Sequence, residues 1–262
     1  MKIIVLAKQV PNTDEVAIDK KTGTLIRESA SSILNPDDAN ALEAALSMKE
    51  QNPGAVVSVL SMGPPQATLM LRECLAMGAD DAYLLSSRAF AGADTAATSA
   101  TLAAGIQKIG AFDIIFAGRQ AIDGDTAQVG PQTARRLGIP CVSYVQKIRE
   151  FRTSTVVVER ALEDGYEVIE VQRPCVLTAI RELNNPRSMT VKQIEEAFHK
   201  ELTVWDEKDL ALSPETIGLQ GSPTQVEKCF APPSKQACEI LSGTTSDLAR
   251  ALVAKLNEKQ II

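Results

Sequence analysis

Glycines, carboxylates and a hydroxyl gather in the segment 118–130, which reads GRQAIDGDTAQVG. Gly118 and Gly124 allow a ligand to approach the backbone closely, because they carry no Cβ. We expect a helix to open at Asp125 or at the threonine after it, and the free N–H groups of a helix N-terminus bind phosphate. Asp123 and Asp125 would accept hydrogen bonds from ribose hydroxyls or an adenine amino group. The pattern predicts a nucleotide site, but a tight strand-to-helix turn with two capping acids explains the same residues equally well.

A second candidate is the helix start at residues 92–98, GADTAAT. Asp94 is of the residue type that caps helices, and Thr95 and Thr98 lie one turn apart and would face the same site. A capped, alanine-rich helix without a ligand is the alternative, and the residues alone favour it. Elsewhere the sequence offers no nucleophile–base pair and no cluster of metal ligands, so we predict no catalytic side chain and no metal site.

Several well-known motifs are missing from the sequence. It has no G-x-G-x-x-G after the first predicted strand and no G-x-x-x-x-G-K-[ST], which argues against a Rossmann dehydrogenase and a P-loop NTPase. The five cysteines are scattered and never form C-x-x-C, so neither a disulfide framework nor a zinc or iron–sulfur site is indicated. We expect reduced, mostly buried thiols. The single histidine, His199, is expected to be a solvated helix residue.

The elements that must position the candidate residues follow from the rhythm of the first 140 residues, where short apolar runs alternate with helical segments. Strands are predicted at 2–8, 55–63, 81–87 and 112–118, and helices at 36–51, 64–79, 94–110 and 125–138. This rhythm is typical of an α/β fold with a doubly wound, mostly parallel sheet covered by helices on both faces. Ligands bind such sheets beyond the carboxyl ends of the strands. Both candidate segments follow predicted strands and would meet there.

The pattern changes after Cys141. Four apolar runs, at 142–151, 154–162, 166–173 and 174–180, follow one another with short polar turns, which predicts antiparallel strands added to the parallel sheet. From Arg181 onward the chain is richer in proline, glycine and polar residues, and it ends in an amphipathic helix. We therefore predict a nucleotide-binding α/β domain at 1–180 and an extended C-terminal arm at 181–262 that lies against this domain or a partner.

Composition narrows the class of protein. The 262 residues are 45% apolar and 23% charged, as in ordinary soluble proteins, and the formal net charge of -6 gives no reason to approach a nucleic-acid backbone. The sequence contains no apolar run of the roughly 20 residues that span a bilayer, and its opening lacks a signal-peptide cleavage pattern. We expect a cytoplasmic protein with no membrane insertion and no nucleic-acid partner.

Residues 158–168, VERALEDGYEV, completed by PCVLT at 174–178, resemble the signature of electron-transfer flavoprotein beta subunits. The resemblance covers nearly the whole chain, because five further motifs match in order: KQVP at 8–11, NPDD at 35–38, AMGADD at 76–81, the segment 118–130, and LNNPR at 183–187. It implies an adenine nucleotide alpha hydrolase-like fold and a heterodimer with an alpha subunit, on which the terminal helix of the arm docks. Ordinary members hold AMP in the beta subunit, whereas flavin-bifurcating members hold a second FAD there.

Three departures from AMP-binding members make the chain most similar to the bifurcating type. Gly124 stands where the family has an acid, Thr126 and Ala127 replace bulkier polar residues, and GADTAAT resembles the segment that meets an isoalloxazine ring. The resemblance places the adenosine beside Leu6, Asn35, Met62, Ala121, Gln128 and Val129, and the phosphates at the Gly124–Thr126 backbone. Together with the strand ends, the predicted cofactor-binding residues are Leu6, Asn35, Met62, Gly63, Asp94, Thr95, Thr98, Gly118, Gln120, Ala121, Asp123, Gly124, Asp125, Thr126, Gln128, Val129 and Gly130.

The bifurcating type implies a site that oxidises NADH and passes one electron to ferredoxin or flavodoxin and the other to the alpha-subunit flavin, as in anaerobic metabolism. NADH would approach near Met62, and the positive end of the helix at Asp94 to Thr98 is a candidate for tuning the flavin. Segment 184–191 resembles the loop that docks acyl-CoA dehydrogenases. That loop carries Pro186, Arg187, Met189 and Val191, and a plain surface loop is the alternative.

Two other functions remain open at this point. An ordinary electron-transfer flavoprotein beta subunit with structural AMP would differ only in the bound nucleotide. A nucleotide-binding domain without redox activity would share the fold, since fold alone does not imply function. A nucleotide-binding domain of that kind does not account for the arm or for the long signature.

Overall fold

The computed structural model describes residues 1–12, 17, 18, 25, 26, 31–227 and 240–262. They fall into two units, Met1–Glu227 and Lys228–Ile262. The first unit is built on a nine-stranded sheet in the order β11-β10-β9-β12-β8-β1-β6-β7-β13. Its strands are β1 Lys2–Leu6, β6 Val56–Met62, β7 Asp81–Leu85, β8 Ile114–Gly118, β9 Cys141–Phe151, β10 Thr155–Leu162, β11 Gly165–Gln172, β12 Cys175–Ala179 and β13 Leu202–Trp205.

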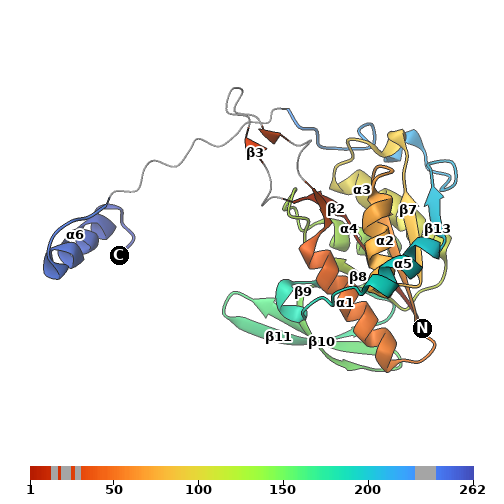
Figure 1. Cartoon of the computed structure of the whole chain (residues 1–262), viewed down its shortest axis with the longest axis horizontal. Helices are drawn as coiled ribbons and strands as arrows, with labels where there is room; N and C mark the ends of the chain where they lie inside the picture. The colour runs from red at the N-terminus through yellow and green to blue at the C-terminus, as the bar shows by residue number, and fades with distance from the viewer. Residues whose placement is uncertain (13–16, 19–24, 27–30, 228–239) are drawn as a thin grey trace. The chain divides into compact units, whose positions relative to one another are not determined.

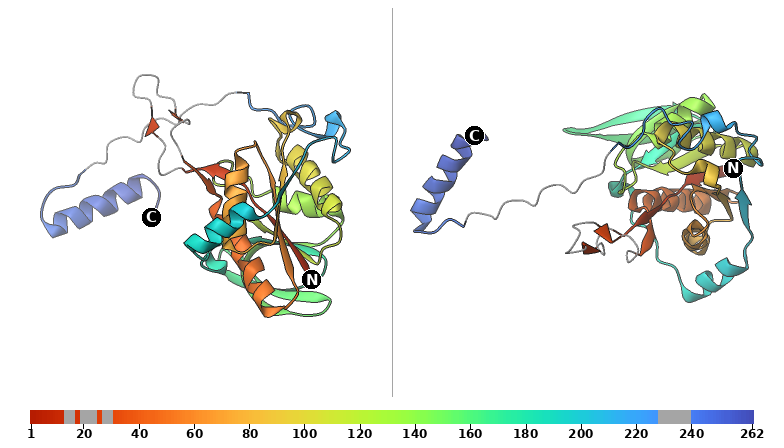
Figure 2. Two further views of the ribbon diagram at one scale, coloured as in Figure 1. Left: turned by 45° about the vertical axis from the view of Figure 1, so that its right-hand side comes forward. Right: turned by 90° about the horizontal axis from the view of Figure 1, so that it is seen from above.

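Helices lie on both faces of this sheet (Figures 1 and 2). They are α1 Pro36–Gln51, α2 Ala67–Met77, α3 Thr95–Ile109, α4 Val129–Leu137 and α5 Val191–His199, with short 3-10 turns η3 Arg88–Phe90, η4 Arg181–Leu183 and η5 Pro214–Thr216. Alternate residues of β1 separate the two cores: Ile3 and Val5 pack under α1 and α2, and Ile4 packs under α3. The α/β fold with a doubly wound, mostly parallel sheet is confirmed.

The order of strands places the switch point at β1. The chain winds from β1 through β6 to β7 on one side and then returns to β8 on the other side of β1, and all these pairings are parallel. Two small antiparallel ladders complete the connections after β1: β2 Gln9–Pro11 with β5 Ser32–Leu34, and β3 Ala17–Ile18 with β4 Leu25–Ile26. The loops after β1 and β8 therefore meet at one point of the sheet edge.

One predicted pairing is wrong. We expected all four strands after Cys141 to be antiparallel, and β10 does pair antiparallel with β9 and β11. However, β12 inserts between β8 and β9 and is parallel to both. The two-strand excursion through β10 and β11 reverses direction twice, so the chain returns to the sheet in its original direction. All five residues of β12 are buried, as a central strand requires.

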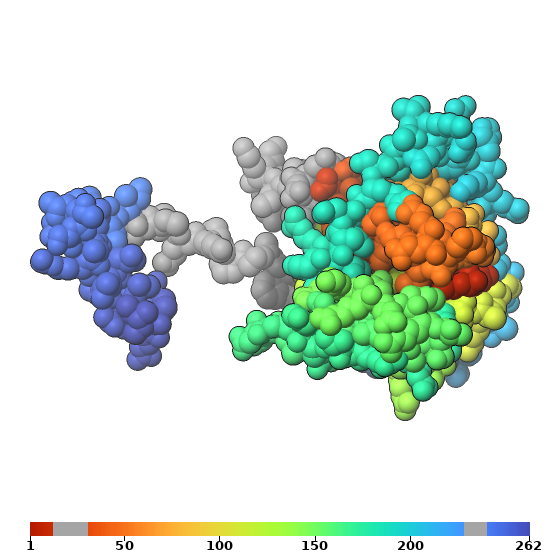
Figure 3. All heavy atoms as spheres, turned by 90° about the horizontal axis from the view of Figure 1, so that it is seen from below, coloured from red at the N-terminus to blue at the C-terminus, as the bar shows by residue number. Residues whose placement is uncertain are grey.

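The first unit extends well past the expected boundary at residue 180. Helix α5 packs on α2, and β13 adds a parallel strand at the edge of β7. Arg187 contacts Glu43 and Glu50 of α1, and Asn184 bonds Asn40 of the same helix. Figure 3 shows this part of the chain lying beside α1 and the β9–β11 strands. These hydrogen bonds and ion pairs attach the segment together with apolar contacts, because Met189, Ala197 and Leu202 pack in or against the core.

The second unit contains α6, Thr245–Glu258, which Thr244 caps by accepting a hydrogen bond from the Asp247 N–H. None of its residues is buried within the described chain, and Leu252 and Val253 are about half exposed. The terminal amphipathic helix is thus confirmed as an element. Among the described residues, no helix is both long enough and apolar enough to cross a membrane.

Gly118, at the end of β8, packs directly against the start of α1. A Cβ at this position would lie 2.3 Å from Asp38 Oδ1 and 2.8 Å from the Asp38 backbone nitrogen. Gly124 lies six residues on in the following loop, where an added Cβ would meet nothing within 4 Å. The two glycines therefore form a matched pair for testing the packing at the switch point.

We expect Gly118→Ala to lower the free energy of unfolding of the full chain by about 1 to 3 kcal/mol, because Asp38 must move to admit the methyl group. Gly124→Ala should change it by less than about 0.5 kcal/mol. Urea titration followed by circular dichroism measures both values. Equal effects of the two substitutions would contradict the close approach of Gly118 and Asp38.

Candidate functional site

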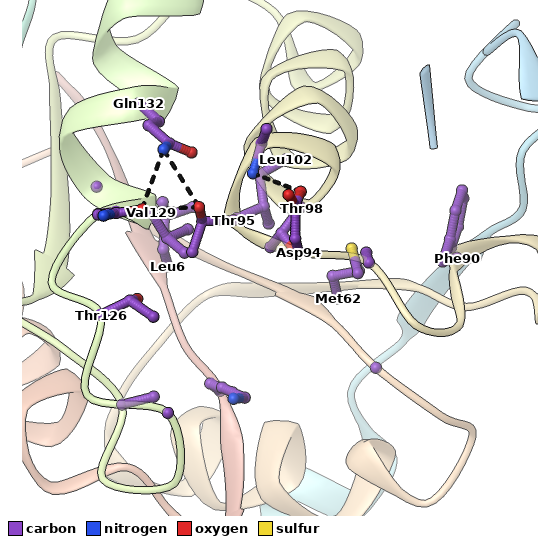
Figure 4. A pocket seen from close by; sticks show the side chains of 18 of the residues that line it. Leu6, Met62, Phe90, Asp94, Thr95, Thr98, Leu102, Thr126, Val129 and Gln132 are labelled. Atoms are coloured by element: carbon purple, nitrogen blue, oxygen red, sulfur yellow. Dashed lines mark hydrogen bonds between the residues drawn. The ribbon is translucent and has the colours of Figure 1, made fainter. Parts of the chain in front are cut away.

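A large cleft lies beyond the carboxyl ends of β1, β6, β7 and β8. Its volume is about 1250 Å³, and its lining is mostly apolar with hydroxyl and amide groups between. In Figure 4, Thr95, Val129 and Gln132 gather between the first turns of α3 and α4, and Phe90 stands at the far end beyond Met62. The cleft is therefore elongated, with a polar end between two helices and a more apolar end at η3.

The loop from β8 to α4 forms one wall of this cleft. Asp125 and Ala127 adopt the left-handed conformation, with φ of 47° and 52°. These turns lengthen the loop, so α4 begins at Val129. The prediction that the helix opens at Asp125 or Thr126 is therefore wrong. Pro131 now falls in the first turn of α4, where its missing N–H costs nothing.

The N-terminus of α4 has a geometry that is suited to binding phosphate. Gln128 holds the N-cap position but makes no capping hydrogen bond with its side chain. Val129 and Gly130 form the start of the first turn and line the cleft, and the Gln128 side chain does not bond their N–H groups. An anionic group placed there would gain their hydrogen bonds and the positive end of the helix dipole. This position lies three to four residues beyond the predicted one.

Three predicted residues that do not line the cleft, Asn35, Asp123 and Asp125, help to tie this loop to its surroundings. Asn35 is fully buried; its side chain donates to the Gln120 carbonyl and accepts from the Ile122 N–H. Lys8 pairs with Asp123 at 2.7 Å, and Gln120 donates to Asp125 at 2.7 Å. Asn35, Asp123 and Asp125 thus hold the loop in shape, and all the other predicted cofactor-binding residues line the cleft.

Helix α3 faces α4 across the polar end. Asp94 caps α3 by accepting from the N–H groups of Ala96 and Ala97. Thr95 donates to Gln128 at 2.9 Å and accepts from Gln132 at 3.2 Å, so its hydroxyl joins the two helix starts. Because the Asp94 carboxylate already occupies two N–H groups, it offsets the positive potential that we expected from this helix end.

A buried carboxylate lies beneath the cleft. Asp38 accepts hydrogen bonds from the Lys8 N–H at 2.8 Å and the Gly118 N–H at 2.9 Å, so it bridges the ends of β1 and β8. Burial raises the pKa of Asp38 to about 7 despite these hydrogen bonds and one from Asn35. Its neighbour Asp37, whose pKa burial also raises, faces Arg119 at 3.3 Å.

Sequence reasoning missed the end of the cleft near η3 and one wall from far along the chain. The lining residues that were not predicted include Arg88, Phe90, Leu102, Gln132, Pro223, Thr224 and Val226. Phe90 and Arg88 follow the third predicted strand, and the switch-point rule applied to that strand would have found them. No local signal marks Pro223, Thr224 or Val226, since only the tertiary fold brings them to α3.

The four predicted docking residues differ in their exposure to solvent and in their contacts. Val191, the first residue of α5, is 84% exposed, and Pro186 is exposed. Met189 packs against the core, and Arg187 is committed to an ion pair with Glu43 at 2.8 Å. Ile194 and Phe198 of α5 are also exposed, at 40% and 60%. Val191 therefore heads an apolar stripe, while Arg187 anchors the loop that presents it.

The remaining candidate groups contribute no chemistry within the described residues. Cys74, Cys141 and Cys175 are free thiols, and Cys229 and Cys238 lie outside that part of the chain. Burial raises the pKa of Cys141 to about 11 and that of Cys175 to about 12, so neither is a reactive thiolate at neutral pH. His199 is exposed at the end of α5, as expected. The described residues contain no group of three or more potential metal ligands.

Asp38→Asn tests the bridge between the strand ends. The folded pKa of about 7 exceeds the ordinary 3.8, so the folded state binds a proton that the unfolded state has released, and stability falls as pH rises from about 4 to about 7. The asparagine variant lacks this titration but places an amide N–H₂ near a backbone donor. We expect it to be less stable than the native chain at pH 4, with the deficit shrinking by up to roughly 4 kcal/mol at pH 7. Urea unfolding at both pH values measures this, and a pH-independent deficit would contradict it.

Comparison with known proteins agrees with this architecture. The electron transfer flavoprotein domain matches residues 22–210. The chain is 61% identical to the caffeyl-CoA reductase-Etf complex subunit CarD of Acetobacterium woodii, 55% identical to the electron transfer flavoprotein subunit beta of Clostridium acetobutylicum, and 48% identical to the acryloyl-CoA reductase electron transfer subunit gamma of Anaerotignum propionicum. Each match covers all of both chains. A full-length resemblance at this level, together with the predicted signature, shows that this chain belongs to the electron transfer flavoprotein family as a beta subunit.

Proposed function

We propose that this chain is the beta subunit of a flavin-bifurcating electron transfer flavoprotein, that its cleft holds FAD, and that NADH is the electron donor. It would work in a heterodimer with an alpha subunit that carries a second flavin. One of the two electrons of NADH would pass to ferredoxin or flavodoxin. The other would pass through the alpha subunit to an acyl-CoA dehydrogenase. The site would lie in the cytoplasm and serve anaerobic metabolism.

The size of the cleft is the observation that carries this proposal. Small-molecule sites measure about 300 to 1,000 Å³, and this cleft measures about 1250 Å³. A mononucleotide such as AMP seated at α4 would leave the end near Phe90 unfilled. A dinucleotide extends along the whole cleft, with its phosphates at the α4 N-terminus and its ring system toward Met62 and Phe90.

The lining suits such a ligand. Leu6, Ala121 and Val129 offer apolar contacts for an adenosine, and the uncapped N–H groups of α4 suit a pyrophosphate. Thr98 lies between Thr95 and Met62 and lines the middle of the cleft (Figure 4). Gly124, with open space where its Cβ would be, leaves room beside the phosphates. Bound FAD would supply the exchange between two-electron and one-electron transfer, and this chain would orient it and exclude water.

The relatives support the partner class. Two of them are named as subunits of caffeyl-CoA reductase and acryloyl-CoA reductase complexes. Both names contain a reductase that acts on an acyl-CoA compound, so an acyl-CoA dehydrogenase is the partner that we propose here. The exposed stripe of Val191, Ile194 and Phe198 is the surface that would receive it.

The nucleotide content of the complex tests the cofactor. We expect the chain co-expressed with its alpha subunit to release two FAD and no AMP per heterodimer after denaturation, as quantified by chromatography. One FAD with one AMP would reject the bifurcating assignment and leave an ordinary electron carrier. A complex in which this chain holds neither nucleotide would reject the cleft as a nucleotide site.

Thr98→Val tests whether the middle of the cleft contacts the flavin. Loss of one hydrogen bond should weaken FAD binding by roughly three- to tenfold, because a single bond contributes about 0.5 to 1.5 kcal/mol. Thr68→Val is the matched control, since Thr68 lies in the first turn of α2, bonds the Pro65 carbonyl and does not line the cleft. Flavin fluorescence titration of the stripped complex measures both constants, and equal constants for all three proteins would reject the contact.

Val191→Asp tests docking at the head of α5. We expect electron transfer to the acyl-CoA dehydrogenase to fall by about tenfold or more, since a charge would have to be desolvated in an apolar contact. NADH oxidation with an artificial dye should be unchanged. Val191→Ile keeps the apolar side chain and should behave like the native protein. A parallel loss with dye and dehydrogenase would place the defect elsewhere.

A further inference from the structure

A short segment late in the chain reaches back to the cleft. We call residues Ile217–Val226 the latch. Ile217 is buried in the core under α3, and the Leu219 N–H donates to the Ala91 carbonyl at 3.0 Å. Gly218 has φ of 56°, and a Cβ there would lie 2.0 Å from the Ala89 carbonyl oxygen. The start of the latch is thus held tightly against the loop that leads into α3.

The latch is fastened to the cap of α3. The buried Ser222 hydroxyl accepts from the Asp94 N–H at 2.8 Å and donates to the Gly218 carbonyl at 2.7 Å. Thr224 donates to Asp94 Oδ2 twice, from its hydroxyl at 2.7 Å and from its N–H at 3.1 Å. The other carboxylate oxygen, Oδ1, caps the helix. Asp94 therefore joins the helix start and the latch through one side chain.

These hydrogen bonds favour the ionised carboxylate. Partial burial raises the pKa of Asp94, but the bonds from the Ala97 N–H and from Thr224 outweigh it and hold the pKa below its ordinary value. A charged acceptor makes stronger hydrogen bonds than a neutral one. The fastening is consequently built from charge-assisted bonds, although Thr224 itself lies at the surface.

The latch forms one wall of the cleft. Pro223, Thr224 and Val226 are the only lining residues that come from beyond Gln132 in the described chain. Val226 is 81% exposed and Pro223 is also exposed, although both border the cleft. Apolar side chains beside an open cleft gain free energy when a flat apolar ligand covers them. A planar heteroaromatic ring fits this chemistry better than a sugar or a phosphate does.

We propose that the latch retains the ring end of the ligand in the cleft, and that the Thr224–Asp94 contact is the fastening that sets how fast the ligand leaves. The identity of the ligand as FAD rests on the proposed function, but the retaining role does not. Thr224 is a positioning residue here, because it acts by holding Pro223 and Val226 at the cleft. Weakening the fastening should increase the rate of release more than it changes the stability of the fold.

The experiment compares three variants in the complex with the alpha subunit. Thr224→Val keeps the shape of the side chain and removes the hydroxyl hydrogen bond to Asp94, while the backbone N–H bond stays. Thr224→Ser keeps that hydrogen bond. Thr216→Val is the control, because Thr216 lies just before the latch, bonds only the local Ser213 carbonyl among the described contacts, and does not line the cleft.

Release of the nucleotide held by this chain is followed after dilution, with the released species identified by chromatography. We expect Thr224→Val to release it about three- to tenfold faster, the effect of one lost hydrogen bond, with Thr224→Ser and Thr216→Val at the native rate. The melting temperatures of all four proteins should agree. An unchanged rate in Thr224→Val, or equal acceleration in Thr216→Val, would overturn the proposal.

The same measurement separates this proposal from the proposed function. If the released nucleotide is AMP and Thr224→Val still releases it faster, the latch stands and the assignment of FAD fails. If it is FAD and the rate does not respond to Thr224, the latch fails and the assignment of FAD stands. A faster release that appears only together with a lower melting temperature would count against a retaining role.

Discussion

The cleft depends on the hydrogen bonds that the carboxyl group of Asp38 accepts at the switch point of the sheet. In a doubly wound sheet the chain must part in opposite directions at the switch point, and the backbone there loses its regular ladder partners. Asp38 meets this need by accepting the N–H groups of Lys8 and Gly118, which follow β1 and end β8. A glycine must stand at 118, since the carboxylate occupies the space of a Cβ. The wall that begins at Gly118 and the strand end at Leu6 are thereby held at a defined separation.

Polar side chains perform most of the remaining positioning around the cleft. Asn35 holds the loop after β8 by two backbone groups, and Thr95 ties the starts of α3 and α4. A fold that leaves a large cleft at its edge must provide hydrogen-bond partners for the polar groups around that cleft. Unpaired buried polar atoms are costly. The result is a hydrogen-bonded frame around an open cleft. Such pre-organisation reduces the entropy that binding would otherwise consume.

The two helix starts at the cleft differ in electrostatic character. At α3 the Asp94 carboxylate takes up the first N–H groups, whereas at α4 no side chain does so. An anionic part of a ligand is therefore favoured at α4, and a neutral ring is better suited to the region near α3. This asymmetry gives an elongated ligand one preferred direction in the cleft.

Local patterns in the sequence determined the alternating strands and helices of the first 140 residues, because apolar periodicity and capping signals act over a few residues. Together with the family resemblance, the switch-point rule also located part of the cleft lining, because it converts strand ends into neighbours. Only the tertiary structure decided that β12 runs parallel between β8 and β9, that α4 starts at Val129, and that Asp94 is shared with Thr224. These outcomes depend on contacts between residues far apart in the chain or on left-handed turns at non-glycine residues. Neither leaves a periodic signal in the sequence.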